Sequence, residues 1–217
     1  LTLFLPLAQT RLDDLGWTDV GMGKVAALST DLALGDLDLQ NLRIDARSIT
    51  IDGRVEGVGM GDLDFRALGD ITIAATGAVS DARTAAFSAG RPILPDYPGL
   101  NPGAGLLMSD GAHVEAGTVD IAVTGIARLT GIAATTRTDG ATAIAIHAGS
   151  LENGGDSRTD LTANEPGTRT VIAAGTSGLK RGQGWTTRIN TLRAEVGNGP
   201  LAFEEADTLI VEHMETG

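Results

Sequence analysis

The fold is decided by the first strongly alternating stretch of the chain, which reads Gly35-Asp-Leu-Asp-Leu-Gln-Asn-Leu-Arg-Ile-Asp-Ala-Arg-Ser-Ile-Thr-Ile-Asp-Gly53. Leu37 and Leu39 fall on one side of an extended chain and the aspartates on the other, because successive side chains of a strand point to opposite faces. The alternation changes phase at Gln40-Asn41, which we interpret as a β-bulge. The stretch ends in Asp52-Gly53, a pair typical of two-residue hairpins, so it predicts strands joined as antiparallel neighbours.

Alternation with a period of two recurs along the chain, for example in 62–65, 70–73, 119–123 and 144–146. A second Asp-Gly pair, Asp139-Gly140, precedes another alternating segment. Helical patterns are weak: 24–28 could form one or two helical turns, and 201–207 has the composition of a short helix. We therefore predict an all-β fold, namely a mostly antiparallel sandwich or barrel of short strands and tight hairpins with little helix.

A short motif of glycine, aspartate and alternating apolar residues occurs three times, beginning at Gly35, Gly61 and Gly69. A solenoid needs a unit that recurs at a fixed period over several turns. The three copies are unevenly spaced, so we interpret them as hairpin chemistry repeated on one sheet. A β-solenoid is the less favoured alternative.

A proline-rich segment near the middle of the chain suggests a division. Four of the seven prolines lie in 91–102, and proline removes the backbone donor that a sheet needs. We predict an N-terminal β lobe over 1–90, a Pro/Gly-rich arm or crossover over 91–108 and a C-terminal β lobe over 109–217. One continuous domain is the alternative.

Composition narrows the classes of function. The 217 residues include no cysteine, which excludes disulfides and thiolate metal sites. A net charge of -12 argues against nucleic-acid binding, because phosphates require clustered cations. No apolar run approaches the roughly 20 residues of a membrane-spanning helix, and no motif indicates a cofactor.

Two pairs of aspartates are the calcium candidates that the pattern offers, whereas His113, His147 and His213 are far apart in sequence and would have to converge in space to bind a transition metal. Asp36 and Asp38 alternate on one predicted strand, and Asp62 and Asp64 alternate on another. Neighbouring strands would gather four carboxylates that could bind Ca²⁺ through oxygen ligands. A solvated outer face is the favoured interpretation.

The sequence predicts that the protein is not an enzyme. Its histidines are isolated in sequence, and no nucleophile-elbow pattern occurs. The alternative would need a site assembled from separate residues, for example His147 with Asp156 and Ser150.

The favoured function is a structural subunit of an extracellular, cell-surface or virion assembly, such as a filament, a pilus-like fibre or a virion appendage. Its partner would be itself or another subunit, joined by β-strand addition and loop contacts. The apolar run at the start of the chain and the proline-rich arm supply the candidate contacts, which are Leu1, Leu3, Phe4, Leu5, Leu7, Pro95, Tyr97 and Pro98. Residues 1–9 could instead be the tail of the apolar region of a secretion signal, although the strand interpretation is slightly favoured. The alternative function is a periplasmic or secreted binding module whose sheet curls into an apolar groove for lipid or another ligand.

Overall fold

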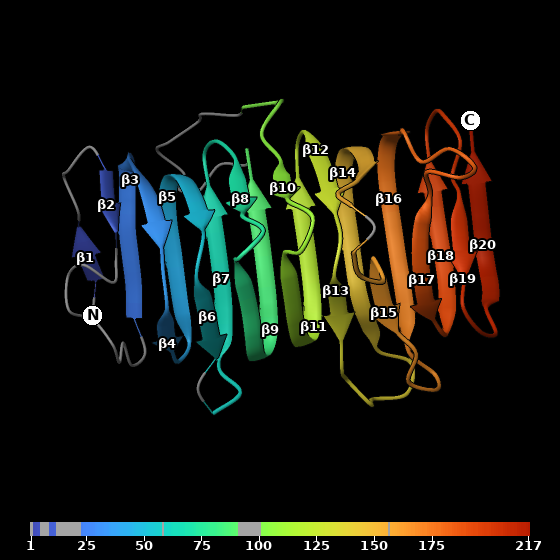
Figure 1. The fold of residues 1–217 in the computed structure, drawn as a ribbon, viewed down its shortest axis with the longest axis horizontal. Coiled ribbons are helices and arrows are strands. Elements are labelled where there is room, and N and C mark those ends of the chain that lie inside the picture. The colour runs from blue at the N-terminus through green and yellow to red at the C-terminus, as the bar shows by residue number, and fades with distance from the viewer. Residues whose placement is uncertain (1, 5–8, 12–22, 58, 91–100, 156) are drawn as a thin grey trace.

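The chain folds into a stack of parallel strands, a β-solenoid of about 8 turns, which runs from the N-terminal strands at the left of Figure 1 to β20 at the right. A computed structural model describes residues 2–4, 9–11, 23–57, 59–90, 101–155 and 157–217, and it describes side chains from residue 31 onward, except at 39. In these ranges 20 strands form one sheet, every strand pairing is parallel and no helix is present.

The strands stack in three ladders, A, B and C, which the chain visits in the order C, A, B during each turn. Several long strands bend and contribute to two ladders. Ladders C and A share β9 (Ala78–Ala89) and β11 (His113–Val123). Ladders A and B share β3 (Gly23–Leu34), β5 (Leu42–Ile51), β14 (Thr142–Asn153) and β16 (Arg169–Ser177).

The remaining strands each belong to one ladder. Ladder A also contains β1 (Thr2–Phe4), β7 (Asp62–Ala67), β18 (Thr191–Val196) and β20 (Ile210–Thr216). Ladder B also contains β2 (Gln9–Arg11), β8 (Ile71–Ile73), β10 (Leu106–Met108) and β12 (Ile126–Leu129). Ladder C also contains β4 (Leu37–Leu39), β6 (Arg54–Gly57), β13 (Ile132–Ala134), β15 (Leu161–Ala163), β17 (Trp185–Ile189) and β19 (Phe203–Glu205).

Apolar side chains at equivalent positions of successive turns lie on top of one another and fill the interior. One row of register positions in ladder A, here called the A-row, runs through almost the whole chain, and its side chains are described from Ile44 onward. Its register positions are Leu3, Val25, Ile44, Phe65, Phe87, Ile121, Ile146, Ile172, Ala194 and Met214. The members from Ile44 to Ala194 are essentially inaccessible to solvent. This continuous row explains why alternation with a period of two dominates the sequence, because only one face of each strand is buried.

The prediction of a mostly antiparallel sandwich or barrel is wrong, because the Asp-Gly pairs turn corners rather than hairpins. β5 and β6 lie on either side of Asp52-Gly53 but pair with other strands: β5 with β3, β7 and β8, and β6 with β4 and β9. A Cβ on Gly53 would lie 2.5 Å from the carbonyl carbon of Gly35, so glycine is needed where one corner stacks on the previous one. Asp36 adds to this contact by accepting a hydrogen bond of 2.8 Å from the Arg54 N–H.

The interpretation of the repeats is wrong for a related reason. The motifs beginning at Gly35, Gly61 and Gly69 lead into β4, β7 and β8, which belong to ladders C, A and B respectively. They are therefore three sides of the solenoid rather than three turns of it. The change of phase at Gln40-Asn41 is the corner between β4 and β5, with Asn41 at a φ of 47°.

Two further sequence expectations concern 201–207 and the central segment. The prediction of a short helix over 201–207 is wrong, because this segment contains strand β19.

The strands on either side of the central segment pair with each other. Residues 91–100 lie outside the described residues, and β9 and β11 pair from His113↔Ala78 to Val123↔Ala89. The buried core also includes residues from both sides of this segment. The division into lobes stays a prediction.

Candidate functional site

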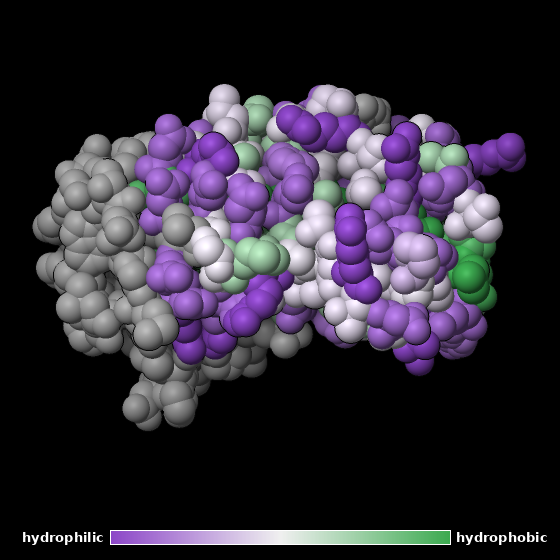
Figure 2. Space-filling view, turned by 90° about the horizontal axis from the view of Figure 1, so that it is seen from below, coloured by the Kyte–Doolittle hydropathy of each residue, from purple (hydrophilic) through white to green (hydrophobic). Residues whose placement is uncertain are grey.

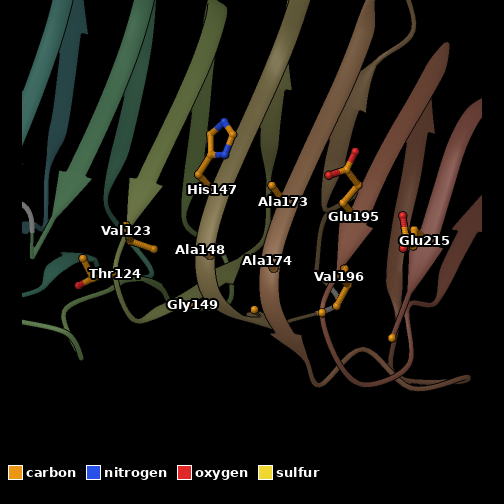
Figure 3. Close-up of a pocket in the computed structure, with 13 residues that line it drawn as sticks. Val123, Thr124, His147, Ala148, Gly149, Ala173, Ala174, Glu195, Val196 and Glu215 are labelled. Carbon is orange, nitrogen blue, oxygen red and sulfur yellow. The ribbon is translucent and has the colours of Figure 1, made fainter.

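A shallow groove follows the corner between ladders A and B in the C-terminal half of the solenoid (Figure 3). Its floor is a column of glycines, Gly149, Gly175, Gly197 and Gly217. A Cβ on Gly175 would lie 2.9 Å from the Gly149 oxygen, and one on Gly197 would lie 2.9 Å from the Gly175 oxygen. The absence of side chains at this corner lets the turns stack closely and leaves a hollow of about 780 Å³.

The rim of the groove carries one outward row of ladder A. Its register positions are His147 on β14, Ala173 on β16, Glu195 on β18 and Glu215 on β20. Figure 3 shows the small side chain of Ala173 between those of His147 and Glu195. Two strand spacings, about 10 Å, therefore separate the backbones that carry His147 and Glu195.

The charged groups on this rim are engaged with one another. Arg193 donates a hydrogen bond of 2.9 Å to Glu195, and the His213 Nε2 lies 3.8 Å from Glu195 and 3.6 Å from Glu215. The hydrogen bond and charge of Arg193 hold the pKa of Glu195 below its ordinary value. The rim thus carries the exposed ion pair of Arg193 with Glu195, with the His213 ring close to both glutamates. Within the described residues no group of histidines and carboxylates is arranged to hold a metal ion.

A second unusual surface is the C-terminal end of the solenoid, which we call the end face. It is formed by β20, all of whose residues are exposed. Four large hydrophobic side chains stand out as exposed in the described part of the chain, and three belong to this strand: Ile210 (54%), Val211 (50%) and Met214 (45%). Figure 2 shows hydrophobic residues gathered at this end, whereas the side of the molecule is largely hydrophilic.

The end face exposes its apolar residues because β20 has a neighbour on one side only. In the described residues the one strand that pairs with β20 is β18. Val211 and Met214 occupy the register of the buried Leu192 and Ala194, which are covered by the turn that follows them. An edge of this kind presents free N–H and C=O groups to another strand.

The four predicted calcium ligands lie on two different ladders. Asp36 and Asp38 lie at β4 in ladder C, which pairs with β6 rather than β7. Asp62 and Asp64 lie on β7 in ladder A and form ion pairs with arginines: Asp62 with Arg83, and Asp64 with Arg66 at 2.6 Å. The structure does not bring the two pairs together.

The residues of the alternative catalytic site are also not brought together where the structure describes them. His147 points outward from ladder A, whereas Ser150 lies beyond the Gly149 corner in ladder B. No hydrogen bond joins His147 to Ser150 in this described stretch, and Asp156 lies outside the described residues.

The predicted assembly contacts are described only in part. Leu3 and Phe4 lie in β1, which pairs with β3, and the side chains of β1 lie outside the described residues. The other contacts, which are Leu1, Leu5, Leu7, Pro95, Tyr97 and Pro98, also lie outside them.

Sequence reasoning missed the end face. The pattern Thr208-Leu-Ile-Val-Glu212 indicates a strand, but exposure depends on which strands cover it. Predicting which strand remains uncovered requires the order in which the parallel strands stack, and the alternation of apolar and polar residues does not specify this order. The corner groove was also missed. The glycines that form it are spaced unevenly along the chain, and only the stacking order brings them into one column.

Comparisons with known proteins add no assignment. No family model matches the chain, no curated protein matches it, and no solved structure matches it. In the described residues there is no helix of the length and apolar character needed to cross a membrane.

Proposed function

We propose that the protein is a structural subunit of an extracellular assembly, such as a filament, a pilus-like fibre or a virion appendage, joined through the edges of its sheet. The observation that carries this proposal is the end face, where an open parallel edge coincides with exposed Ile210, Val211 and Met214. Exposed apolar surface beside free backbone groups is suited to the addition of another strand. The stacked core also supports the proposal. Each turn of the solenoid packs on the previous turn through the same row of apolar side chains, and a further strand from another molecule could pack on the last turn in the same way.

The energetic scale of such a contact is modest for each side chain. Full burial of a valine or methionine contributes roughly 1.5–3 kcal/mol. About half of each side chain on the end face is still exposed, so covering it contributes roughly 1 kcal/mol per residue. Loss of two such contacts is expected to weaken association by at least about tenfold.

The test compares the unaltered chain with the double variant Val211→Asp/Met214→Lys, which leaves net charge unchanged. Light scattering and negative-stain microscopy are expected to show oligomers or fibres of the unaltered chain and their loss in the variant. Met60→Lys is the control, because Met60 is 64% exposed and lies in the connection between β6 and β7, far along the stack from β20 (Figure 1). A chain that is monomeric at all concentrations, or a double variant that assembles normally, would overturn the proposal.

The alternative function, a periplasmic or secreted binding module, would use the groove at the glycine corner. The hollow of about 780 Å³ is large enough for a small ligand. Its lining combines small residues with His147, Glu195 and Glu215, and its larger apolar side chains are Val123 and Val196. This lining suits a polar ligand better than an acyl chain. Native mass spectrometry of the purified chain would detect a retained ligand.

A further inference from the structure

We propose that the turn Lys180-Arg181-Gly182 binds a tetrahedral oxyanion, namely a phosphate or sulfate group that is either free or carried on a polymer. The turn lies in the connection between β16 and β17 (Figure 1). This inference goes beyond the proposed function, because it involves neither contact between copies of the chain nor either end of the stack.

The first observation is that the basic side chains of this region have no ion pair, unlike those elsewhere on the surface. Carboxylates lie within ion-pair distance of Arg43, Arg47, Arg54, Arg66, Arg83, Arg128, Arg137, Arg169 and Arg193. Among the side chains that the structure describes, the lysine and arginine residues without such a partner are Arg158, Lys180, Arg181 and Arg188. Lys180 and Arg181 are adjacent and exposed. In a chain with a net charge of -12, two neighbouring cations without carboxylate partners indicate an anion from outside the chain.

The second observation is that the backbone of the turn offers free donors. The Gln183 N–H donates a hydrogen bond of 2.8 Å to the Lys180 oxygen, and Gly182 has a φ of 78°. This is a tight β-turn that needs glycine at its third position. In the described residues no acceptor lies within hydrogen-bond distance of the Arg181 and Gly182 N–H groups. Successive N–H groups of a turn form a concavity that binds anions.

The third observation is that the turn is fixed at both ends. At its start Leu179 is fully buried, and the Leu179 N–H donates a hydrogen bond of 3.1 Å to the Ser177 Oγ. At its end the Asn153 Nδ2 donates a hydrogen bond of 3.0 Å to the Gly184 oxygen. Binding therefore has to order only the two basic side chains, and this reduces its entropic cost.

A hollow of about 560 Å³ beside the turn gives room for the oxyanion and part of its carrier. Lys180 and Gly182 line it together with Glu152, whose carboxylate is the one acidic group of the lining. Arg128 donates hydrogen bonds of 2.9 and 2.8 Å to the Glu152 Oε2, so the charge of Glu152 is balanced. The site takes one anionic group at a time and needs no extended basic surface of the kind that nucleic acids require.

The experiment follows the backbone amide signals of the isotope-labelled chain by nuclear magnetic resonance during titration with sodium phosphate and, separately, sodium sulfate at low ionic strength. The expected result is a saturable shift of the Arg181 and Gly182 signals. Lys180→Gln and Arg181→Gln are each expected to weaken binding by roughly fivefold or more, because each removes a charge-assisted hydrogen bond. Arg137→Gln is the matched control, since it removes the same charge from a side chain that is 83% exposed and lies between β13 and β14. It should leave the affinity unchanged.

The absence of saturable shifts at Arg181 and Gly182 would overturn the inference. Equal affinity of the unaltered chain and the two turn variants would overturn it as well, and so would equal weakening by Arg137→Gln, because that would show a general effect of charge.

A second arm of the experiment identifies the source of the group by adding dextran sulfate in place of the free ions. Shifts of the same two signals at a lower concentration of sulfate groups support a sulfated polymer as the ligand. Shifts with the free ions alone support a small anion. Both results retain the site at this turn.

Discussion

Phe65 and Phe87 stack in the interior with ring centroids 5.2 Å apart and ring planes inclined by 16°. They face each other across one turn of the solenoid, in the parallel pair formed by β7 and β9. Both side chains are buried, and both belong to the A-row. The pair shows how each turn is stabilised by the same position in the turns above and below it.

Replacing either ring is expected to destabilise the whole stack. Phe87→Ala leaves a cavity between Phe65 and Ile121, and loss of a buried phenylalanine typically costs about 3–5 kcal/mol. Urea unfolding followed by circular dichroism should show this loss as a lower midpoint. Phe203→Ala is the control, because Phe203 is only partly buried near the C-terminal end. An equal loss from both variants would contradict the special role of the A-row.

The glycine corner predicts a steric rather than a cavity effect. A Cβ on Gly149 would lie 2.3 Å from the backbone oxygen of Thr124, so the two turns would have to separate. We expect Gly149→Ala to cost about 1–3 kcal/mol, the usual cost of overpacking. In Gly103→Ala the added carbon has only the Asn101 Oδ1 near it, at 3.8 Å, so its stability should be unchanged or slightly increased. Thermal unfolding of both variants would test this, and equal melting temperatures would refute it.

The strands and their buried faces could be predicted from the sequence, but their order could not. Alternation in 37–51 correctly indicated the buried apolar side chains from Leu42 to Ile51, but it did not indicate that Asp45 is buried as well, and the side chain of Leu39 lies outside the described residues. The same alternation fits an antiparallel hairpin and a parallel turn, because it reports one buried face and not the direction of the neighbour. The Asp52-Gly53 pair then favoured the hairpin. In the structure, Gly53 is needed for another reason, because the backbone of Gly35 lies too close to leave room for a Cβ.

The repeat was hidden by the varying lengths of the turns. Thr187 and Glu205 contact each other from adjacent turns although only 18 residues separate them. Thr84 and Thr118 do the same across 34 residues. Insertions at the corners leave the ladder unchanged, so a fixed period is not maintained in the sequence. The end face and the groove depend on this stacking, and for that reason no local motif indicated them.

Ion pairs on the outside of the solenoid predict that its stability depends on pH in the acid range. The hydrogen bond and charge of Arg83 lower the pKa of Asp62, and those of Arg47 lower the pKa of Asp31, with help from Ser48. A carboxyl group whose pKa is lower when folded stabilises the protein above its unfolded pKa, about 3.9. That stabilisation is lost as the pH falls through the lower, folded value.

Arg83→Gln should therefore reduce the loss of stability between about pH 5 and pH 2. The effect is expected to be small, because the Asp62 side chain is 43% exposed and exposed pairs are screened by solvent. Melting temperatures of the unaltered chain and the variant across this range provide the measurement. A variant that loses more stability than the unaltered chain on acidification would contradict the assigned direction.

Salt should strengthen the proposed association rather than weaken it. Each copy carries a net charge of -12, so approaching copies repel, whereas the contact itself involves Ile210, Val211 and Met214. Raising ionic strength from 0.01 to 0.15 M shortens the screening length from about 30 to about 8 Å. Repulsion falls while apolar burial is retained. Light scattering over a sodium chloride series should show growing assemblies. Glu215→Gln, which removes an exposed charge beside the contact, should shift the transition to lower salt. Assemblies that instead dissolve as salt rises would show that charge pairs, and not the apolar residues of the end face, hold the copies together.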